Sequence, residues 1–171
     1  MVAAGVATAA LVRPLGFALP LQGAKGYGLT GEPALAPRLP LYLTEARVGV
    51  SPFDCAVRLA GTLELGSRDG AVDRRRVAAL VHGATAYLRP EALVRDGEPW
   101  AGARPLLPDG LPAIGPVPGW ANAHVATGHG MLGITLAPVT GEAVADAVTA
   151  GRLPERLSAL DPRRFARSSV L

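Results

Sequence analysis

Two segments in the second half of this 171-residue chain carry residue types that could do chemistry. The first places Arg104 between Trp100 and a turn that reads Pro105-Leu106-Leu107-Pro108-Asp109-Gly110, ending at Gly115. A guanidinium held before such a rigid turn can bind a carboxylate through two parallel hydrogen bonds. Trp100, Gly102 and Arg104 should share one face of a strand, because alternate residues of a strand point the same way.

The second segment reads Gly128-His129-Gly130-Met131-Leu132-Gly133 and lies between an expected strand and an expected helix. Glycines let backbone N–H groups approach a ligand closely, and a helix N-terminus favours negative charge. A flavin whose N1–C2=O2 edge lay there would be stabilised as its reduced anion. The two segments together indicate a pocket that receives an anion on one side and a planar cofactor on the other.

Each of these features also has a purely structural interpretation. Most arginines are solvated surface groups, and the glycines at 128–133 could serve only the close packing of strand and helix. Asp109-Gly110 is explained by turn chemistry, and His129 could bind a cofactor or support the loop. A second Gly-x-Gly-x-x-Gly at 26–31 precedes Glu32-Pro33 rather than a helix, so we interpret it as a coincidence. The copy at 128–133 is not followed by the second strand and acidic residue of a complete dinucleotide-binding fingerprint.

Composition excludes several other classes of function. Hydrophobic residues make up 49% of the chain, which rules out disorder, and a net charge of +3 spread along the sequence does not indicate nucleic-acid binding. Cys55 is the single cysteine, so no disulfide framework or thiolate metal cluster is expected. The histidines at 82, 124 and 129 lack the spacing of a zinc site, and no Gly-x-Ser-x-Gly segment could seat a serine nucleophile.

Alternating and glycine-rich stretches predict the strands that position these segments. Residues 2–5 read as a short buried strand, 20–30 as extended, 100–106 and 122–127 as further strands. Between 41 and 66 apolar and polar residues alternate, with one predicted face formed by Val57, Leu59, Gly61, Leu63 and Leu65. The class is therefore α+β, a largely antiparallel sheet with flanking helices.

Three helices are expected. Residues 7–15 are apolar and end near Gly16, and 73–88 have an apolar stripe with a period near 3.6 and Asp73 as a plausible N-cap. The third helix follows the glycine loop and ends near Gly151, and its small residues should pack against a sheet: Ala137, Gly141, Val144, Ala145 and Val148. We expect neither a signal peptide nor a transmembrane span, because the apolar N-terminus has no preceding positive region and is interrupted at Arg13-Pro14. The segment beyond Pro154 is expected to be a surface tail.

In order and spacing, these segments resemble the FAD-dependent D-amino-acid oxidoreductases, which include D-amino-acid dehydrogenase, D-amino-acid oxidase and glycine oxidase. The resemblance lies in Trp100 to Pro105, Pro108 to Gly115 and Thr127 to Thr135, with weaker matches at Lys25-Gly26-Tyr27 and the opening residues. It covers nearly the whole chain and is closest to the bacterial dehydrogenases. It corresponds to the C-terminal half of the family, without the N-terminal Rossmann unit.

The resemblance implies a role for each of the residues in these segments. Arg104 would bind the substrate carboxylate, Gly5 would pass near the phosphates of FAD, and the remaining cofactor contacts would come from Gly128, His129, Gly130, Met131, Leu132, Gly133, Ile134 and Thr135. No catalytic base and no metal ligand is implied. The implied reaction is oxidation of a D-amino acid to its imino acid and then a 2-oxo acid, with hydride transfer to flavin N5.

It also implies an organisation of the chain. Within one partial domain over 1–171, residues 1–20 would be a remnant of the FAD-binding domain and 21–105 a substrate-binding sheet. Residues 106–151 would supply the flavin-lining loop, strand and helix, and 152–171 a tail. The chain would then be a truncated frame or one piece of a split enzyme, inactive without a Rossmann-containing partner.

Three departures from the family leave alternatives open. Nothing supplies the Rossmann unit, Gly5-Val6-Ala7-Thr8 replaces an aromatic-plus-serine pattern, and 48–51 carries no tyrosine to accompany Arg104. A non-catalytic binding domain, or a relative acting on glycine, sarcosine or hydroxyproline, would fit the same residues. A cytoplasmic location is expected, with the inner face of a membrane as the alternative if the electron acceptor is a quinone rather than oxygen.

Overall fold

The computed structural model describes residues 1–66 and 70–166, and the chain divides into two compact units. Unit 1 comprises Met1–Gly23 and Arg104–Leu171, and unit 2 comprises Ala24–Ala103. Unit 2 occupies most of the segment 21–105 assigned above to the substrate-binding sheet, and the assignment of 1–171 to one partial domain stays a prediction. The last five residues of the expected tail, 167–171, lie outside the described residues.

Unit 2 is built on a five-stranded sheet in the order β2-β3-β4-β1-β5. The strands are β1 (Gln22–Gly31), β2 (Leu41–Leu43), β3 (Val48–Pro52), β4 (Val57–Leu65) and β5 (Glu98–Leu106). The pairs β2–β3, β3–β4 and β4–β1 are antiparallel, which confirms the α+β class with a largely antiparallel sheet. The ends of β1 and β5 continue into unit 1, so β5 carries the chain to Arg104.

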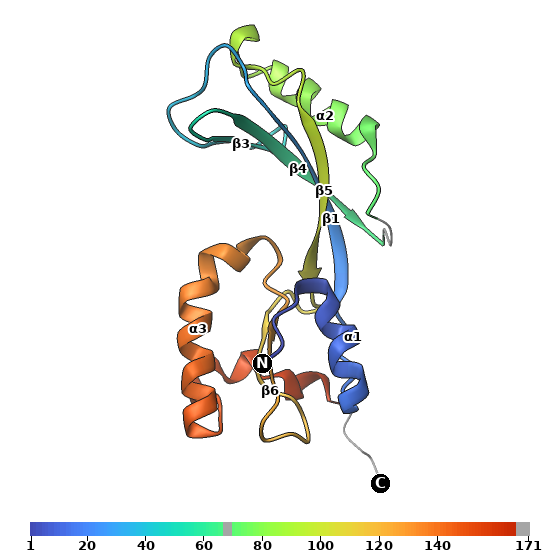
Figure 1. The fold of residues 1–171 in the computed structure, drawn as a ribbon, viewed down its shortest axis with the longest axis vertical. Helices are drawn as coiled ribbons and strands as arrows, with labels where there is room; N and C mark the ends of the chain where they lie inside the picture. The colour runs from blue at the N-terminus through green and yellow to red at the C-terminus, as the bar shows by residue number, and fades with distance from the viewer. Residues whose placement is uncertain (67–69, 167–171) are drawn as a thin grey trace. The chain divides into compact units, whose positions relative to one another are not determined.

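Helix α2 (Arg74–Thr85) covers this sheet (Figure 1). Its Val77, Leu80 and Ala84 are buried in one cluster with the inward residues of β3 and β4, as the 3.6-residue period predicts. The Asp73 carboxylate accepts a 2.8 Å hydrogen bond from the backbone N–H of Arg75, so the expected N-cap is confirmed. A short 3-10 helix, η3 (Pro90–Ala92), leads from this helix towards β5.

The alternation predicted along β4 is wrong beyond Gly61. Thr62 has a φ of +59°, and the β1–β4 register shifts there, so that β4 holds one extra residue. A bulge of this kind turns the following side chains to the opposite face. Leu63 and Leu65 are therefore 47% and 67% exposed, and Glu64 instead accepts a 2.5 Å hydrogen bond from the buried Tyr27 hydroxyl.

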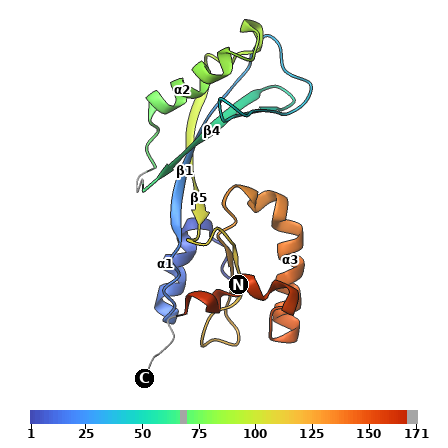
Figure 2. The same ribbon diagram turned by 180° about the vertical axis from the view of Figure 1, so that it is seen from behind.

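Unit 1 is built around an antiparallel ribbon of β6 (Ala113–Pro116) and β7 (His124–Thr127). Helix α1 (Thr8–Val12), extended by η1 (Gly5–Ala7) and η2 (Arg13–Leu15), lies on one side of β6, and α3 (Gly133–Ala150) lies on the other (Figures 1 and 2). Both helices end, as expected, at glycines with positive φ, Gly16 and Gly151. The remaining 3-10 helices are η4 (Gly130–Leu132), η5 (Glu155–Leu160) and η6 (Pro162–Phe165).

Two expectations for unit 1 are wrong. Helix α3 packs on β6 through Ala143 and Ala147, and four of the five small residues predicted to pack are exposed: Ala137, Gly141, Ala145 and Val148. The segment beyond Pro154 is not a surface tail throughout, because Asp161 and Pro162 are buried and both η5 and η6 pack against β6. Both predictions failed because they used only the size or charge of the residues. The neighbours that bury one side of α3 and part of the segment beyond Pro154 cannot be seen in the local sequence.

One helical stretch among the described residues, Gly130–Ala150, is long and apolar enough by length and composition to cross a bilayer. A single such helix is weak evidence, because the core helix of a soluble protein passes the same test. The predicted absence of a transmembrane span therefore stays a prediction.

The contact between Gly28 on β1 and the Trp100 ring on β5 gives a test of the sheet. A Cβ at Gly28 would lie 2.4 Å from Trp100 Cε2, so Gly28→Ala must displace a rigid ring. We expect a loss of about 1–3 kcal/mol in unfolding free energy, measured by urea denaturation. Gly49→Ala on β3 is the control, because its nearest neighbour would be the Ala60 carbonyl oxygen at 3.6 Å. Equal midpoints for the two variants would show that the ring does not rest on Gly28.

Candidate functional site

The opening residues of the chain lie alongside β7 in unit 1. Val2 donates to the His124 carbonyl at 2.8 Å and accepts from the Ala126 N–H at 3.1 Å, forming a parallel bridge with Val125. Three residues on, the Thr127 hydroxyl donates to the Gly5 carbonyl at 3.0 Å. Because the two segments run parallel, both leave this pairing at the same end and both enter helices there. The structure thus brings Gly5 and the Gly128 loop together across 122 positions of sequence.

The glycines of the loop occupy positions that a side chain would disturb. Gly128 and Gly130 have φ values of +85° and +58°, which L-residues rarely adopt. A Cβ at Gly128 would lie 2.6 Å from Leu107 Cδ1, and one at Gly130 would lie 3.1 Å from Leu106 Cδ2. The loop backbone therefore rests directly on the end of β5 and the residue that follows it.

The start of α3 offers backbone N–H groups. Its N-cap residue, Leu132, makes no side-chain capping hydrogen bond, and the first turn holds no acidic residue. The first N–H groups of a helix have no partner within the helix, and the helix dipole adds partial positive charge there. The surrounding residues of the expected cofactor site are open to solvent: Met131, Leu132, Ile134 and Thr135. This end of unit 1 can accept a ligand that presents negative charge.

Arg104 lies near this loop. It is partly exposed, and among residues 1–66 and 70–166 its guanidinium makes no hydrogen bond or ion pair. Leu106, which a Cβ at Gly130 would touch, points to the same side of β5 two residues further on. Two residues of strand span roughly 7 Å, so the arginine leaves the backbone within side-chain reach of the glycine loop.

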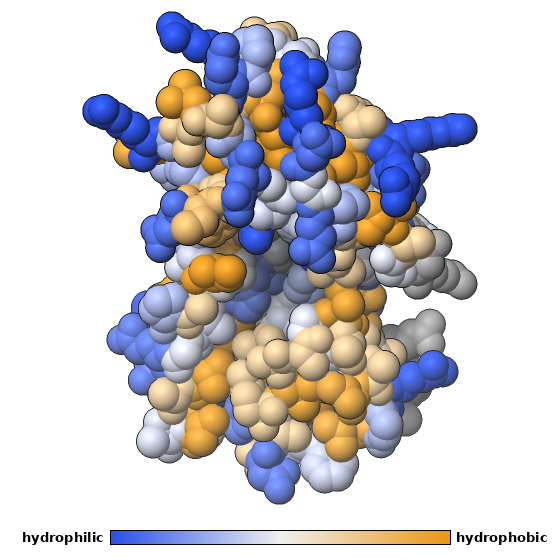
Figure 3. Space-filling view, turned by 45° about the horizontal axis from the view of Figure 1, so that its top comes forward, coloured by the Kyte–Doolittle hydropathy of each residue, from blue (hydrophilic) through white to orange (hydrophobic). Residues whose placement is uncertain are grey.

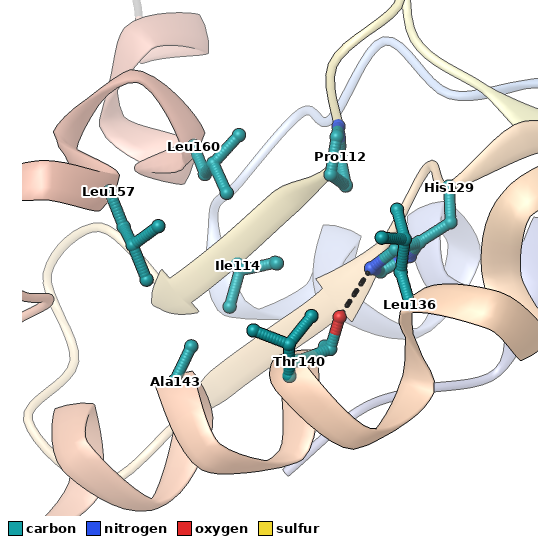
Figure 4. Close-up of a pocket in the computed structure, with 9 residues that line it drawn as sticks. Pro112, Ile114, His129, Leu136, Thr140, Ala143, Leu157 and Leu160 are labelled. Carbon is teal, nitrogen blue, oxygen red and sulfur yellow. Dashed lines mark hydrogen bonds between the residues drawn. The ribbon is translucent and has the colours of Figure 1, made fainter.

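The imidazole of His129 faces away from this surface. Figure 4 shows it beneath α3, where Nε2 lies 3.0 Å from the Thr140 hydroxyl. The cavity it enters, of about 100 Å³, is otherwise lined by apolar groups such as Ile114, Leu136 and Ala143. Burial lowers the pKa of His129, so the neutral ring is favoured. Because the side chain pairs with Thr140, any contact of His129 with a cofactor would have to come from its backbone.

Sequence reasoning missed the residue that fixes the turn after Arg104. Arg164, on η6, donates to the Asp109 carboxylate at 2.7 Å and to the carbonyl oxygens of Leu111 at 2.9 Å and Pro112 at 3.2 Å. Asp109 also accepts the Leu111 N–H at 3.1 Å, and the guanidinium holds the pKa of its carboxyl below the usual range. The run of arginines in the tail was the signal, but nothing in it marks one as structural.

Of the predicted site residues, the structure thus brings together Gly5, the loop from Gly128 to Thr135 and Arg104. The His129 side chain points away from this group, towards Thr140. The assembled groups are the Arg104 guanidinium, which has no partner within the described part of the chain and suits a carboxylate, and a set of backbone N–H groups suited to an electron-rich edge or an anion. Neither group is a base or a nucleophile, so the arrangement binds and orients.

Comparison with known proteins gives consistent results. The model of the family described as FAD dependent oxidoreductase matches residues 1–147. D-amino acid dehydrogenase of Vibrio cholerae is 34% identical over 172 residues, covering 99% of this chain, and that of Methylobacterium nodulans is 36% identical over 156 residues, covering 90%. This chain spans only 41% and 37% of those two proteins.

The solved structures agree. Glycine oxidase from Geobacillus kaustophilus superimposes with a TM-score of 0.77 at 27% identity, over 96% of this chain and 44% of its own. L-proline dehydrogenase from P. horikoshii gives 0.78 at 19% identity, over 96% and 46%, which is a likeness of fold alone.

The buried His129 makes a prediction about pH. An unfolded histidine titrates near 6.5 and the folded pKa is lower, so below about 6.5 the unfolded state binds more protons and stability falls as pH falls. His129→Gln should remove this contribution, which urea denaturation between about pH 7.5 and 5 would measure as a shallower loss. His82→Gln, at an exposed position on α2, is the control. An unchanged pH dependence in His129→Gln would contradict the assignment.

The Arg164 contacts predict a role in stability. Arg164→Ala should cost about 1.5–3 kcal/mol in unfolding free energy, because it removes a partly buried charged hydrogen bond and leaves two carbonyl oxygens without their donor. Arg156→Ala is the matched control, since its ion pair with Asp146, at 4.0 Å, is exposed. Similar losses for the two variants would show that the turn does not depend on Arg164.

Proposed function

This chain belongs to the FAD-dependent oxidoreductase family, and we propose that it forms the substrate- and flavin-lining part of an enzyme that oxidises D-amino acids. One observation carries the proposal. The hydrogen bond between Thr127 and Gly5 places two backbone turns side by side, and Arg104, which pairs with none of the residues that the structure describes, leaves β5 within reach of them.

The residues present fit FAD. The Gly5 carbonyl accepts a hydrogen bond from the Thr127 hydroxyl. Gly5 has a φ of +54°, and a Cβ built on it would have no atom within 4 Å, so the space beside this residue is open. The start of α3 supplies uncapped N–H groups next to Gly128 and Gly130. By the resemblance, phosphates would pass Gly5 and the ring edge would face the loop. Positive helix-end charge would favour negative charge on that edge.

The chemistry follows from orientation. FAD, when bound, would accept the hydride that leaves the substrate Cα. Arg104 would hold the substrate carboxylate in bidentate fashion, which fixes the position of Cα relative to the loop. The amine would lose its proton to water, and the imino acid would hydrolyse to a 2-oxo acid and ammonia. Because positioning lowers the barrier to such a transfer, no side-chain base is required of this chain.

The choice of substrate rests on the relatives. Those at 34–36% identity are D-amino acid dehydrogenases, whereas glycine oxidase from Geobacillus kaustophilus is 27% identical. Glycine, sarcosine and hydroxyproline carry the same carboxylate, so Arg104 alone does not separate them from D-amino acids. A non-catalytic binding domain would keep the arginine but reduce no electron acceptor. We place the enzyme in the cytoplasm, at the inner membrane face if its electron acceptor is a quinone.

The test is made on the flavin-containing protein that includes this chain, either as one polypeptide or assembled with the part that completes FAD binding. Arg104→Ala should raise the KM for D-alanine by about 10- to 100-fold, the value of a charged hydrogen bond, while flavin absorbance is retained. Arg104→Lys should recover only part of this, because an ammonium cannot form the bidentate pair. Arg89→Ala, at an exposed position in unit 2, is the control. An unchanged KM in Arg104→Ala would remove the carboxylate role.

A further inference from the structure

The glycine loop has little of its own to fix its conformation. Gly128 and Gly130 adopt positive φ values and carry no side chain. Fixing a glycine backbone costs more conformational entropy than fixing any other residue, so such a loop keeps one shape only where contacts impose it. Within residues 128–130 the side chain available for such a contact is that of His129.

The apolar residues that follow His129 do not anchor the loop. Met131 is 74% exposed, Leu132 56% and Ile134 92%. Figure 3 shows that apolar residues form much of the visible surface of unit 1. Because these three side chains are not packed in the interior of unit 1, they do not fix the backbone of the loop.

The His129 side chain instead connects the loop to the body of α3. Its Nε2 lies 3.0 Å from the Thr140 hydroxyl, as Figure 4 shows. Thr140 lies about two turns after Gly133, the first residue of α3. One hydrogen bond therefore sets the position of the loop relative to the helix whose first N–H groups lie beside it.

The surroundings of this pair strengthen the hydrogen bond. The other residues that line the cavity are all apolar, among them Ile114 of β6, Leu136 of α3 and Leu157 of η5. A hydrogen bond in apolar surroundings is stronger than one in water, and a buried polar group without a partner costs desolvation energy. His129 and Thr140 are thus each other's polar partner in this cavity.

A second side-chain hydrogen bond fixes the entry to the loop. Thr127 donates to the Gly5 carbonyl at 3.0 Å, directly before Gly128. We propose that His129 is a positioning residue: by pairing with Thr140 it holds the backbone N–H groups of the glycine loop in the arrangement that binds the flavin edge. The inference rests on the proposed function for the identity of the ligand, and on the hydrogen bond for the geometry.

The packing of α3 does not depend on this pair. Ala143 and Ala147 bury the helix in one cluster with Ile114 and Leu153. Loss of the Thr140 hydroxyl should therefore loosen the loop while the helix stays packed. This difference separates a positioning role from a role in folding.

The first measurement is backbone N–H relaxation by NMR on the 171-residue chain. Thr140→Val keeps the shape of the side chain but removes the hydroxyl. The order parameters of residues 128–133 should then fall from the rigid value of about 0.85 towards about 0.6. Thr140→Ser keeps the hydroxyl and should match the wild type. Thr149→Val is the matched control, because the Thr149 hydroxyl is exposed and donates to the Ala145 carbonyl of its own helix.

The second measurement is the affinity for FAD of the flavin-containing protein that includes this chain. FAD is removed and then titrated back, and its binding is followed by the quenching of flavin fluorescence. Thr140→Val should raise the Kd for FAD about three- to tenfold, because binding must then order a loop that the wild type holds in place. Thr140→Ser and Thr149→Val should keep the wild-type Kd.

Three results would overturn the positioning role. A wild-type value for Thr140→Val in either measurement would show that the hydroxyl does not act on the loop or on the flavin. Equal effects of Thr140→Val and Thr140→Ser would assign the change to packing. Loss of the folded state in Thr140→Val, seen by circular dichroism, would assign the pair to folding.

Failure of this role and failure of the proposed function are distinguishable. If Thr140→Val loosens the loop and weakens FAD binding but D-alanine is not oxidised, the role of His129 stands and the proposed reaction is wrong. If D-alanine is oxidised and Thr140→Val binds FAD as the wild type does, the proposed reaction stands and the role of His129 is wrong.

Discussion

The parallel pairing between the first residues of the chain and β7 is the constraint on which the candidate site depends. It consists of two backbone hydrogen bonds at Val2 and one side-chain bond from Thr127 to Gly5. Because the pairing is parallel, η1 and the Gly128 loop that leads into α3 both begin at the same end of it. An antiparallel pairing would have put Gly5 and Gly128 at opposite ends of the ribbon, with no common surface.

Contacts with neighbouring residues hold the glycine loop and the turn after Arg104 in place. Gly128 and Gly130 rest on Leu107 and Leu106, and Arg164 holds the turn that follows them through Asp109 and two carbonyl oxygens. The polar groups needed for the turn are therefore satisfied from η6, at the far end of the sequence. This leaves the guanidinium of Arg104 as the cation near the loop that forms no ion pair among the described residues.

The sequence predicted the elements whose signals are local. Asp73 caps α2, glycines end α1 and α3 where left-handed backbone is needed, and the segments proposed to bind substrate and cofactor lie in one compact unit. Prediction from the sequence failed where contacts between residues far apart in the chain determine the local structure. No local pattern reveals that Thr62 adopts a positive φ and turns Leu63 and Leu65 outward, or that the His129 ring is drawn to Thr140. Likewise, Arg164 differs from its neighbouring arginines only by what it meets in space.

The two faces of α3 show why one of these failures is informative. Sequence reasoning chose Gly141 and Ala145 as the packing side, while the structure buries Ala143 and Ala147. Both sides contain small apolar residues. Periodicity and composition therefore could not predict which side of α3 packs on the sheet. Glu142 and Asp146 are the charged residues of α3, and apart from them its two sides differ mainly in what packs against them. Contact with β6 therefore decides which side of α3 is buried, and no local pattern in the sequence records where β6 lies.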